Sequence, residues 1–390
     1  MKRLLVTGLF LSLVLALFSA GVSSQIHASD TKAGVAKSLT ATPATGWEQK
    51  WNKVLAEAKK EGKVVLYTRW PLDVRTALTK AFKNKYGIDL EFSPFARGSE
   101  VLVKLQSEQR AGLNFVDVLA ISNTDLLVVL KPQGLLAPIQ PLLFLPEVLN
   151  PKAWRGGQVP YTDKDGLAFS MIMNAARLVV YNKNLVKEGE ITSVKDLLKQ
   201  QYKGKITLND PTVTGAGNAL MAHLGHNLWG EAEAIDFLRR LIRDQEATIQ
   251  RDGRMQIETV ARGKHAVALG EDPPNVEEFF KAGAPIKLAV VKEDNRASAA
   301  TGCFGLPHKP VHPNATIIFL NWLLTKEGQS IFATSFGNAS TRLDASIEGI
   351  NPDFIPIFNE KYYTQDEPFM AASTKWLKIA KQVIDETVKK

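Results

Sequence analysis

Hydrophobic and polar residues alternate along the chain in two periods, which predict helices and strands in turn. In residues 47–62 (WEQKWNKVLAEAKKEG), apolar side chains recur three and four positions apart, and the segment closes with Gly62. This spacing predicts an amphipathic helix that ends at the glycine. The next residues, 63–70 (KVVLYTRW), contain an apolar run that is typical of a buried strand.

Two further helix and strand pairs follow. The sequence predicts helices over residues 73–87 and 99–112, and strands over 88–98 and 115–122. Asp73 is the expected N-cap of the first of these helices, and Gly87 its C-terminal end. Strands that are apolar along their length and separated by helices predict a parallel sheet with helices on both faces.

A proline-rich stretch over residues 132–160 breaks this alternation, and an extended segment over 166–182 follows, which could cross between two domains. A second set of strands and helices then begins, with a capped helix start predicted at Ser193 because Asp196 lies three positions later. A return crossing over residues 292–312 and an amphipathic helix over the last twenty residues complete the pattern.

These elements predict an α/β protein with two lobes, each a mostly parallel sheet flanked by helices, joined by extended crossings. A chain of 390 residues is long enough for two domains. The predicted divisions are residues 47–165 with 298–345 for lobe 1, 166–297 for lobe 2, and 346–390 for a C-terminal helical segment that packs on the lobes.

The first 46 residues carry a different pattern. Lys2 and Arg3 precede an apolar run over residues 4–18, and small and polar residues follow. This order predicts a cleaved secretory signal peptide over residues 1–28 and a flexible leader over 29–46. The run is shorter than the roughly 20 apolar residues of a membrane span, and an uncleaved anchor is the alternative.

Cysteine usage and charge narrow the class of protein. Cys303 is the only cysteine, so no internal disulfide can form, and none near the end of the signal peptide offers a site for a lipid anchor. We therefore expect a periplasmic protein without a lipid anchor. Lys and Arg outnumber Asp and Glu by 48 to 40, but the basic residues are interleaved with acids and form no cluster with aromatic side chains. Nucleic-acid binding is not expected.

Residues 208–225 (LNDPTVTGAGNALMAHLG) superficially match a nucleotide-binding loop. Leu220 stands where a dinucleotide-binding loop needs a third small residue, and a P-loop lysine is absent. The segment instead predicts a helix that begins at Thr214, Gly215 and Ala216. Unpaired N–H groups at a helix start suit a carboxylate or phosphate, and the alternative is that Thr214 merely caps its own helix.

Catalytic and metal-binding motifs are weak in this sequence. A Gly-x-Ser-x-Gly motif is absent, and His223 and His226 have helical spacing without a further ligand nearby. We expect neither a cofactor nor a metal ion, and no enzymatic activity. An exported enzyme on the same fold is the alternative.

Polar residues at the ends of the predicted strands form the candidate ligand site, because open α/β sheets bind ligands there. Arginine grips oxyanions and tryptophan stacks on ligands, whereas an acidic pair suits a cation or acid–base chemistry. Besides the helix start, the candidates are Arg69, Trp70, Arg97, Gly98, Ser122, Asn123, Arg177 on the crossing segment, and the acidic pair Glu271 and Asp272.

Four segments resemble the bacterial periplasmic substrate-binding proteins of ABC importers, in the branch that binds iron(III), thiamine, polyamines and phosphorylated compounds. They are ARLVVYNKNLV, SVKDLLKQQYKGKITLNDPTVTGAG, ETVARGKHAVALGEDPP and HPNATIIFLNWLLTKEGQ. The resemblance covers nearly all of residues 47–345. It implies the two-lobed type II periplasmic-binding fold, a monomer that closes on a small-molecule ligand by hinge motion, delivery to an inner-membrane ABC permease, and an anion at the Thr214–Ala216 helix start.

The resemblance also implies which ligand to expect. Iron(III)-binding members typically carry a Tyr-Tyr pair where this chain has Glu271 and Asp272, and a histidine where it has Arg69 or Trp70. We therefore expect a small anionic organic or phosphorylated ligand. The alternatives are iron(III) or a ferric chelate, a neutral or cationic ligand held by the acidic pair while the arginines form interlobe salt bridges, and a sensor subunit in place of an importer component.

Overall fold

The computed structural model describes residues 46–271, 273–357 and 360–388. The predicted signal peptide, all but the last residue of the leader, and Asp272 lie outside the described residues. No helix within the described part of the chain is long and apolar enough to cross a membrane.

The first sheet is mixed. Strand β1 (Lys63–Thr68) pairs in parallel with β2 (Asp89–Pro94) and with β3 (Val118–Ala120), as the sequence predicts. Strand β13 (Cys303–Pro307) lies antiparallel to β3, and it also pairs with β4 (Leu136–Ala137) and β5 (Ala168–Ser170). The last strands of this sheet therefore come from the proline-rich stretch and from the two crossing segments.

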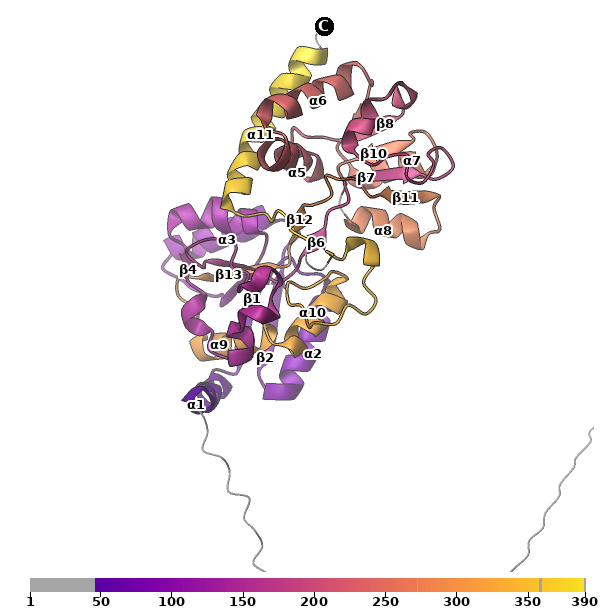
Figure 1. The fold of residues 1–390 in the computed structure, drawn as a ribbon. Helices are drawn as coiled ribbons and strands as arrows, with labels where there is room; N and C mark the ends of the chain where they lie inside the picture. Colours follow the sequence, from indigo (N-terminus) through magenta and orange to yellow (C-terminus); the bar gives the residue numbers. More distant parts are fainter. Residues whose placement is uncertain (1–45, 272, 358–359, 389–390) are drawn as a thin grey trace, which may run out of the picture. The chain divides into compact units, whose positions relative to one another are not determined.

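Five helices accompany this sheet (Figure 1): α1 (Gly46–Glu61), α2 (Leu72–Tyr86), α3 (Gly98–Arg110), α9 (Pro313–Leu323) and α10 (Lys326–Phe336). Gly87 ends α2 with φ 74°, as predicted. The N-cap prediction for this helix is wrong. Pro71, whose ring restricts φ and which has φ −55° here, occupies the N-cap, so Asp73 lies inside the first turn, where its charge favours the helix dipole.

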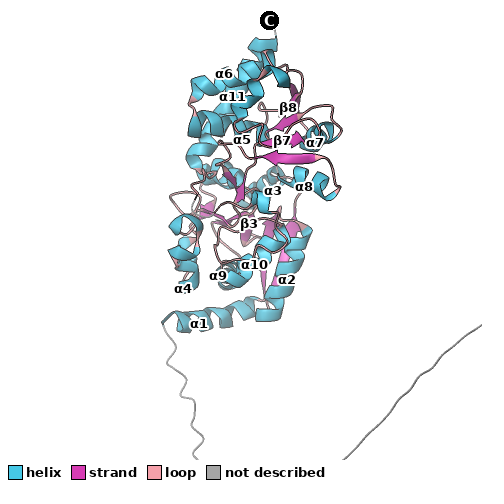
Figure 2. Cartoon of the chain, turned by 45° about the vertical axis from the view of Figure 1, so that its right-hand side comes forward, coloured by secondary structure: helices cyan, strands magenta, loops and turns pink. Residues whose placement is uncertain are grey.

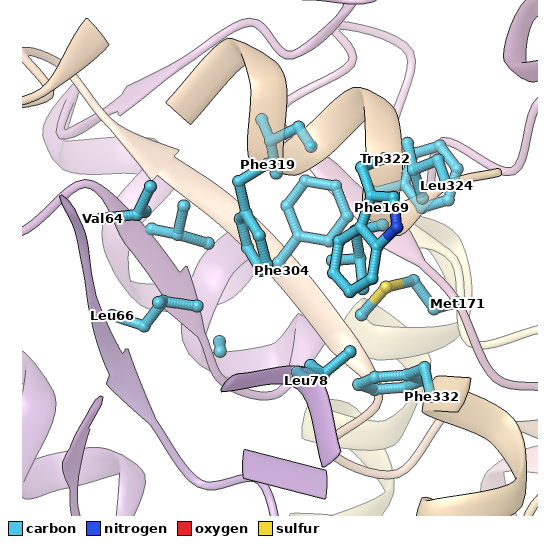
Figure 3. Packing of buried hydrophobic residues seen from close by; sticks show 14 of the residues in the cluster. Val64, Leu66, Leu78, Phe169, Met171, Phe304, Phe319, Trp322, Leu324 and Phe332 are labelled. Carbon is cyan, nitrogen blue, oxygen red and sulfur yellow. The ribbon is translucent and has the colours of Figure 1, made fainter. Parts of the chain in front are cut away.

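Aromatic side chains fill the core between this sheet and its helices (Figure 3). Phe169 of β5 and Phe304 of β13 stack with ring centroids 5.3 Å apart, and Trp322 of α9 lies 5.1 Å from Phe82 of α2. All four side chains are fully buried. Burial of rings from distant parts of the sequence brings β13 and α9 onto the sheet that β1 to β3 begin.

The second sheet has the order β11 (Ile286–Ala289), β7 (Val179–Asn182), β10 (Val267–Leu269), β8 (Ile206–Asn209), β9 (Thr248–Gln250). Strands β8, β9 and β10 are parallel, and β7 is antiparallel to both of its neighbours. Its helices are α5 (Ala216–Ala222), which continues as a π-helix over His223–Leu228, α6 (Glu231–Arg243), α7 (Gly253–Ala261) and α8 (Pro273–Lys281). Figure 2 shows strands and helices in both parts of the fold.

The remaining elements are short. The helix start at Ser193 is confirmed, because Ser193 accepts the N–H of Lys195 and donates its own N–H to Asp196, although the helix is a 3₁₀ turn. The short helical segments are Asp125–Leu130 (π), Lys131–Gln133, Gln140–Leu142, α4 (Pro146–Leu149), Pro151–Ala153, Arg155–Gly157, Val194–Leu198, Gln200–Tyr202 and Pro352–Phe354.

The two predicted crossings lie side by side. Strand β6 (Asn174–Ala175) of the outward crossing pairs antiparallel with β12 (Ala297–Ser298) of the return crossing. The C-terminal helix is confirmed as α11 (Glu367–Val388), which lies along α5 and α6 (Figure 1). The boundaries of the two lobes remain a prediction.

Candidate ligand-binding site

Arg69 and Arg97 lie where the sequence places them, after β1 and β2. Arg69 is half-buried, and its backbone N–H donates to the carbonyl of Ala120 at 2.9 Å. Its guanidinium forms no ion pair within the described residues. Arg97 is exposed and immediately precedes α3, where Glu100 accepts its backbone N–H. Both side chains stay candidates for an anion.

Trp70 is a core residue. Its indole is 2 % exposed, donates Nε1–H to the carbonyl of Thr301 at 3.0 Å, and packs edge-on against Phe332 at 4.9 Å. A side chain buried to this degree presents almost no surface to a ligand, which corrects the expectation that Trp70 stacks on one.

Gly98 and Ser122 serve the fold around Asp125. A Cβ atom on Gly98 would lie 2.2 Å from Oδ2 of Asp125, and the Ser122 hydroxyl donates to the same oxygen at 2.7 Å. A carboxylate of the chain itself therefore lies against the start of α3, where the positive end of the helix dipole favours it. Ser122 holds this carboxylate in place.

Arg177 is engaged within the fold. Its Nε–H donates to the carbonyl of Asp353 at 2.8 Å, and its guanidinium lies 3.5 Å from Oδ2 of Asp294. Its side chain is only 10 % exposed. The arginine therefore ties the crossing segment to the return crossing, and it is not presented free to an anion. Both residues of this ion pair lie within the predicted lobe 2, so interlobe salt bridges of the arginines stay a prediction.

The start of α5 is capped by a side chain that the sequence analysis did not name. Gly215, which has no side chain of its own, is the N-cap of α5, so the alternative that Thr214 caps the helix is wrong. Thr214 and Gly215 are exposed and Ala216 is buried. Oδ1 of Asn209, which the sequence analysis missed, accepts the N–H of Gly217 at 3.0 Å. Anion binding at this start stays a prediction.

Glu271 is buried at the end of β10. It is 3 % exposed and accepts a long hydrogen bond of 3.5 Å from the amide of Asn275. Its predicted partner Asp272 is not described, so the acidic pair as a unit stays a prediction. Within the described residues, no group of three or more His, Cys, Asp or Glu side chains is placed to hold a metal ion.

Asn123 is the member of the predicted set that lines a large cavity of about 920 Å³. Its amide donates to the Ser170 hydroxyl at 2.8 Å, and Thr162 contacts both Asn123 at 3.3 Å and Ser170 at 2.9 Å. These three side chains form a polar network on the cavity wall at the end of β3. The other members of the predicted set that the structure describes do not line this cavity.

The walls of the cavity come from parts of the chain that are distant in sequence: residues 152–162, the paired crossing strands, and the segment after Pro352. Besides the polar network, the lining residues are Lys152, Trp154, Arg155, Gly156, Gly157, Gln158, Pro160, Tyr161, Ile172, Met173, Ala297, Ser298, Ala299, Thr341, Leu343, Ile357, Glu360, Lys361, Tyr362, Thr364, Gln365 and Asp366.

Two polar groups in this cavity lack partners. The Nε atom of Arg155 and the hydroxyl of Tyr161 are buried, and neither has a hydrogen-bond partner among the described residues. Burial lowers the pKa of Arg155 and raises the pKa of Tyr161, because it disfavours the charged form of each. Buried polar groups are almost always hydrogen-bonded in proteins, so an unsatisfied pair in a cavity indicates a place for a polar ligand.

Sequence reasoning missed Arg155 and Tyr161 because both lie in the stretch that interrupts the helix and strand pattern. The available signal was the RGG sequence there. Gly156 and Gly157 have φ of 77° and 69°, a conformation that favours glycine and turns the chain immediately after the arginine.

The chain belongs to the family of bacterial extracellular solute-binding proteins, whose family profile matches residues 77–353. An uncharacterised protein of Haemophilus influenzae is 25% identical over 338 residues, which cover 84% of this chain and 93% of the relative.

Solved structures share the fold. The Trichodesmium protein IdiA (FutA), in complex with iron and citrate, has a TM-score of 0.65 at 19% identity and covers 83% of this chain and 99% of its own. The periplasmic binding protein AfuA of Actinobacillus pleuropneumoniae, with fructose-6-phosphate bound, has a TM-score of 0.57 at 21% identity and covers 84% and 98%.

These similarities confirm two of the predictions from sequence. The fold is the type II periplasmic-binding α/β fold, and the protein is an extracellular solute-binding protein. Members of this family are extracellular or periplasmic binding proteins.

Proposed function

We propose that this protein captures a small organic anion, a carboxylate or a phosphorylated compound, in the cavity beside Arg155, and delivers it to an ABC permease. The observation that carries the proposal is the buried Nε–H of Arg155, which has no hydrogen-bond partner among the described residues. A planar guanidinium with unused donors matches a carboxylate or phosphate better than any other common ligand group. The protein acts in the periplasm as a monomer and without catalysis.

Other residues that line the cavity add to the binding free energy, because one arginine alone does not provide enough of it. A charge-assisted hydrogen bond contributes about 1.5–3 kcal/mol, whereas micromolar binding requires about 8 kcal/mol. The amide and hydroxyls of Asn123, Thr162 and Ser170 offer further hydrogen bonds. Apolar lining from residues such as Ile172 and Leu343 can cover the ligand body. The volume of about 920 Å³ falls within the range of about 300–1,000 Å³ for small-molecule sites.

Two of the similar structures contain bound organic anions, citrate with iron in one and fructose-6-phosphate in the other. A spermidine/putrescine-binding protein, PotD of Streptococcus pneumoniae, shares the fold as well, with a TM-score of 0.61 at 17% identity and coverage of 83% of this chain and 99% of its own. Proteins with this fold therefore bind anionic as well as cationic ligands. For this protein, the proposal of an anionic ligand rests on Arg155.

The test is isothermal titration of the purified protein with citrate, fructose 6-phosphate, inorganic phosphate, ferric citrate and spermidine. We expect at least one organic anion to bind, and Arg155→Met to weaken its binding at least tenfold through the loss of the charge-assisted bond. Arg69→Met is the discriminating variant, because Arg69 is another candidate for the anion and lies outside the cavity.

Three results would contradict the proposal. Binding of spermidine alone would mean a cationic ligand, and binding of ferric citrate without citrate would mean an iron carrier. An unchanged affinity in Arg155→Met, with a loss in Arg69→Met, would move the site to the ends of β1 and β2.

A further inference from the structure

The C-terminal segment of residues 360–366 lines the cavity although it lies beyond the part of the chain that the family profile matches. It supplies six of the lining residues, among them Lys361, Tyr362 and Asp366. The side chains of this wall therefore lie outside the part of the chain that the family profile describes.

The backbone of this segment is fixed on the return crossing. Tyr363 forms a parallel bridge with Arg296, donates its N–H to the carbonyl of Asn295 at 2.7 Å, and accepts the N–H of Ala297 at 2.8 Å. Its ring also packs edge-on against His223 at 5.7 Å. The segment is thus held to the return crossing by a single bridge at Arg296, next to β12.

The end of the segment is fixed as well. Asp366 accepts the N–H of Phe369 at 3.0 Å and so caps the start of α11. Glu367 forms an ion pair with Lys131 at 2.7 Å. Lys131 also forms ion pairs with Asp163 and Asp165. The part of the wall between Tyr363 and Glu367 is therefore preorganised, so little of its conformational freedom is lost when a ligand binds.

The charges on this wall favour an anion. The carboxylate of Asp366 is used in the helix cap, and Glu360 accepts a long contact of 3.5 Å from the Tyr362 hydroxyl. Lys361 is exposed and lies 5.6 Å over the ring of Tyr363, without a carboxylate partner among the described residues. Its ammonium is therefore available to a ligand in the same cavity as Arg155.

We propose that the segment of residues 360–366 sets ligand specificity, with Lys361 as the second cationic contact beside Arg155. The cavity then selects organic anions with two acidic groups over those with one. Lys152 at the cavity edge adds to the positive potential. This inference rests on the proposed function, because it assumes that Arg155 binds the first acidic group.

The experiment compares succinate, a dicarboxylate, with butyrate, a monocarboxylate of the same carbon number, by isothermal titration to the intact protein, Lys361→Met and Arg155→Met. Lys378→Met is the matched control, because Lys378 lies on α11 outside this cavity. We expect Lys361→Met to lower the affinity for succinate about tenfold and to leave the affinity for butyrate unchanged. Arg155→Met should lower the affinity for both anions.

The outcomes separate the two proposals. If Arg155→Met weakens both anions and Lys361→Met weakens neither, the specificity role is wrong and the anion site stands. Equal weakening of both anions by Lys361→Met overturns the selection for two acidic groups. If succinate binds and neither substitution changes its affinity, both proposals are wrong. If neither anion binds to the intact protein, the selection for two carboxylates is wrong, and the titration with citrate and fructose 6-phosphate decides the anion site. Melting temperatures without ligand that match the control show that the variants are folded.

Discussion

His223 is a fully buried histidine that the fold holds without charge. Its Nε2 lies 3.1 Å from the carbonyl of Glu293 and 3.0 Å from Oδ1 of Asn295, and its Nδ1 lies 3.0 Å from the amide of Asn227. Burial, together with the nearby charge of Arg296, lowers the pKa of His223 to about 4. The neutral ring accepts one bond and donates the other, so protonation would break the contact with Asn227.

This shift predicts a loss of stability in acid. The pKa of His223 in the folded state lies below the unfolded value of about 6.5. The contribution of the neutral His223 ring to the free energy of unfolding is therefore fully present above pH 6.5 and is lost as the pH falls towards 4. The difference corresponds to about 3 kcal/mol at pH 4. His223→Gln, which cannot gain the proton, should remove this part of the acid dependence.

The measurement is urea unfolding of the protein and of His223→Gln at pH 7.5 and at pH 4.5. The substitution costs stability at pH 7.5 through altered packing, but the gap between the two proteins should narrow at pH 4.5. His226→Gln, on an exposed side chain of the same π-helix, is the matched control. An unchanged gap would mean that His223 titrates normally in the folded state.

At the scale of elements, the docking of α11 depends on close contact with the helix formed by α5 and its continuation. Trp376 is buried there, and a Cβ atom on Gly225 would lie 2.0 Å from Cζ2 of its ring. Ser373 of α11 forms two hydrogen bonds with Asn218 of α5. The Ser373 hydroxyl donates to Oδ1 of Asn218, and the Asn218 amide donates to the Ser373 carbonyl at 3.0 Å. The glycine lets two helices approach more closely than any other residue would.

Gly225→Ala should therefore destabilise the protein by about 1–3 kcal/mol, because a rigid indole cannot move aside without shifting α11. Gly46→Ala is the matched control, since a Cβ atom there meets nothing within 4 Å. Chemical unfolding of both variants measures the difference. Equal stabilities would show that α11 can slide along its partner helix without cost.

The elements also show what the sequence could and could not predict. Helix α1 and strands β1 and β8 follow from apolar periodicity, which is a local signal. The burial of Trp70 depends on Phe332, more than 250 positions away, and no local pattern reports such a contact. The cavity of Arg155 and Lys361 combines segments without periodicity, so the sequence indicated a cleft protein but gave no sign of this wall.

At the scale of the whole molecule, α11 contributes side chains to hydrophobic clusters on both sheets. Phe369 and Trp376 belong to the core around the second sheet, whereas Met370 packs into the cluster that contains residues of β1 and β3. The ion pair between Glu367 and Lys131 adds a polar contact at the same end of the helix. A helix with side chains in both cores couples their unfolding.

This coupling predicts a single thermal transition that moves as a whole when a ligand binds. At a hundredfold excess over its dissociation constant, a ligand adds about 2.7 kcal/mol to the folded state. When both sheets unfold as one unit, with an unfolding entropy of about 2.1 cal/mol/K per residue, this raises Tm by about 4 °C. Calorimetry with and without a saturating organic anion measures the shift. Two transitions, of which only one moves with the ligand, would mean that the two sheets unfold separately. Helix α11 would then unfold with the second sheet, because Trp376 contributes more to its docking than Met370 and Glu367 contribute on the first sheet.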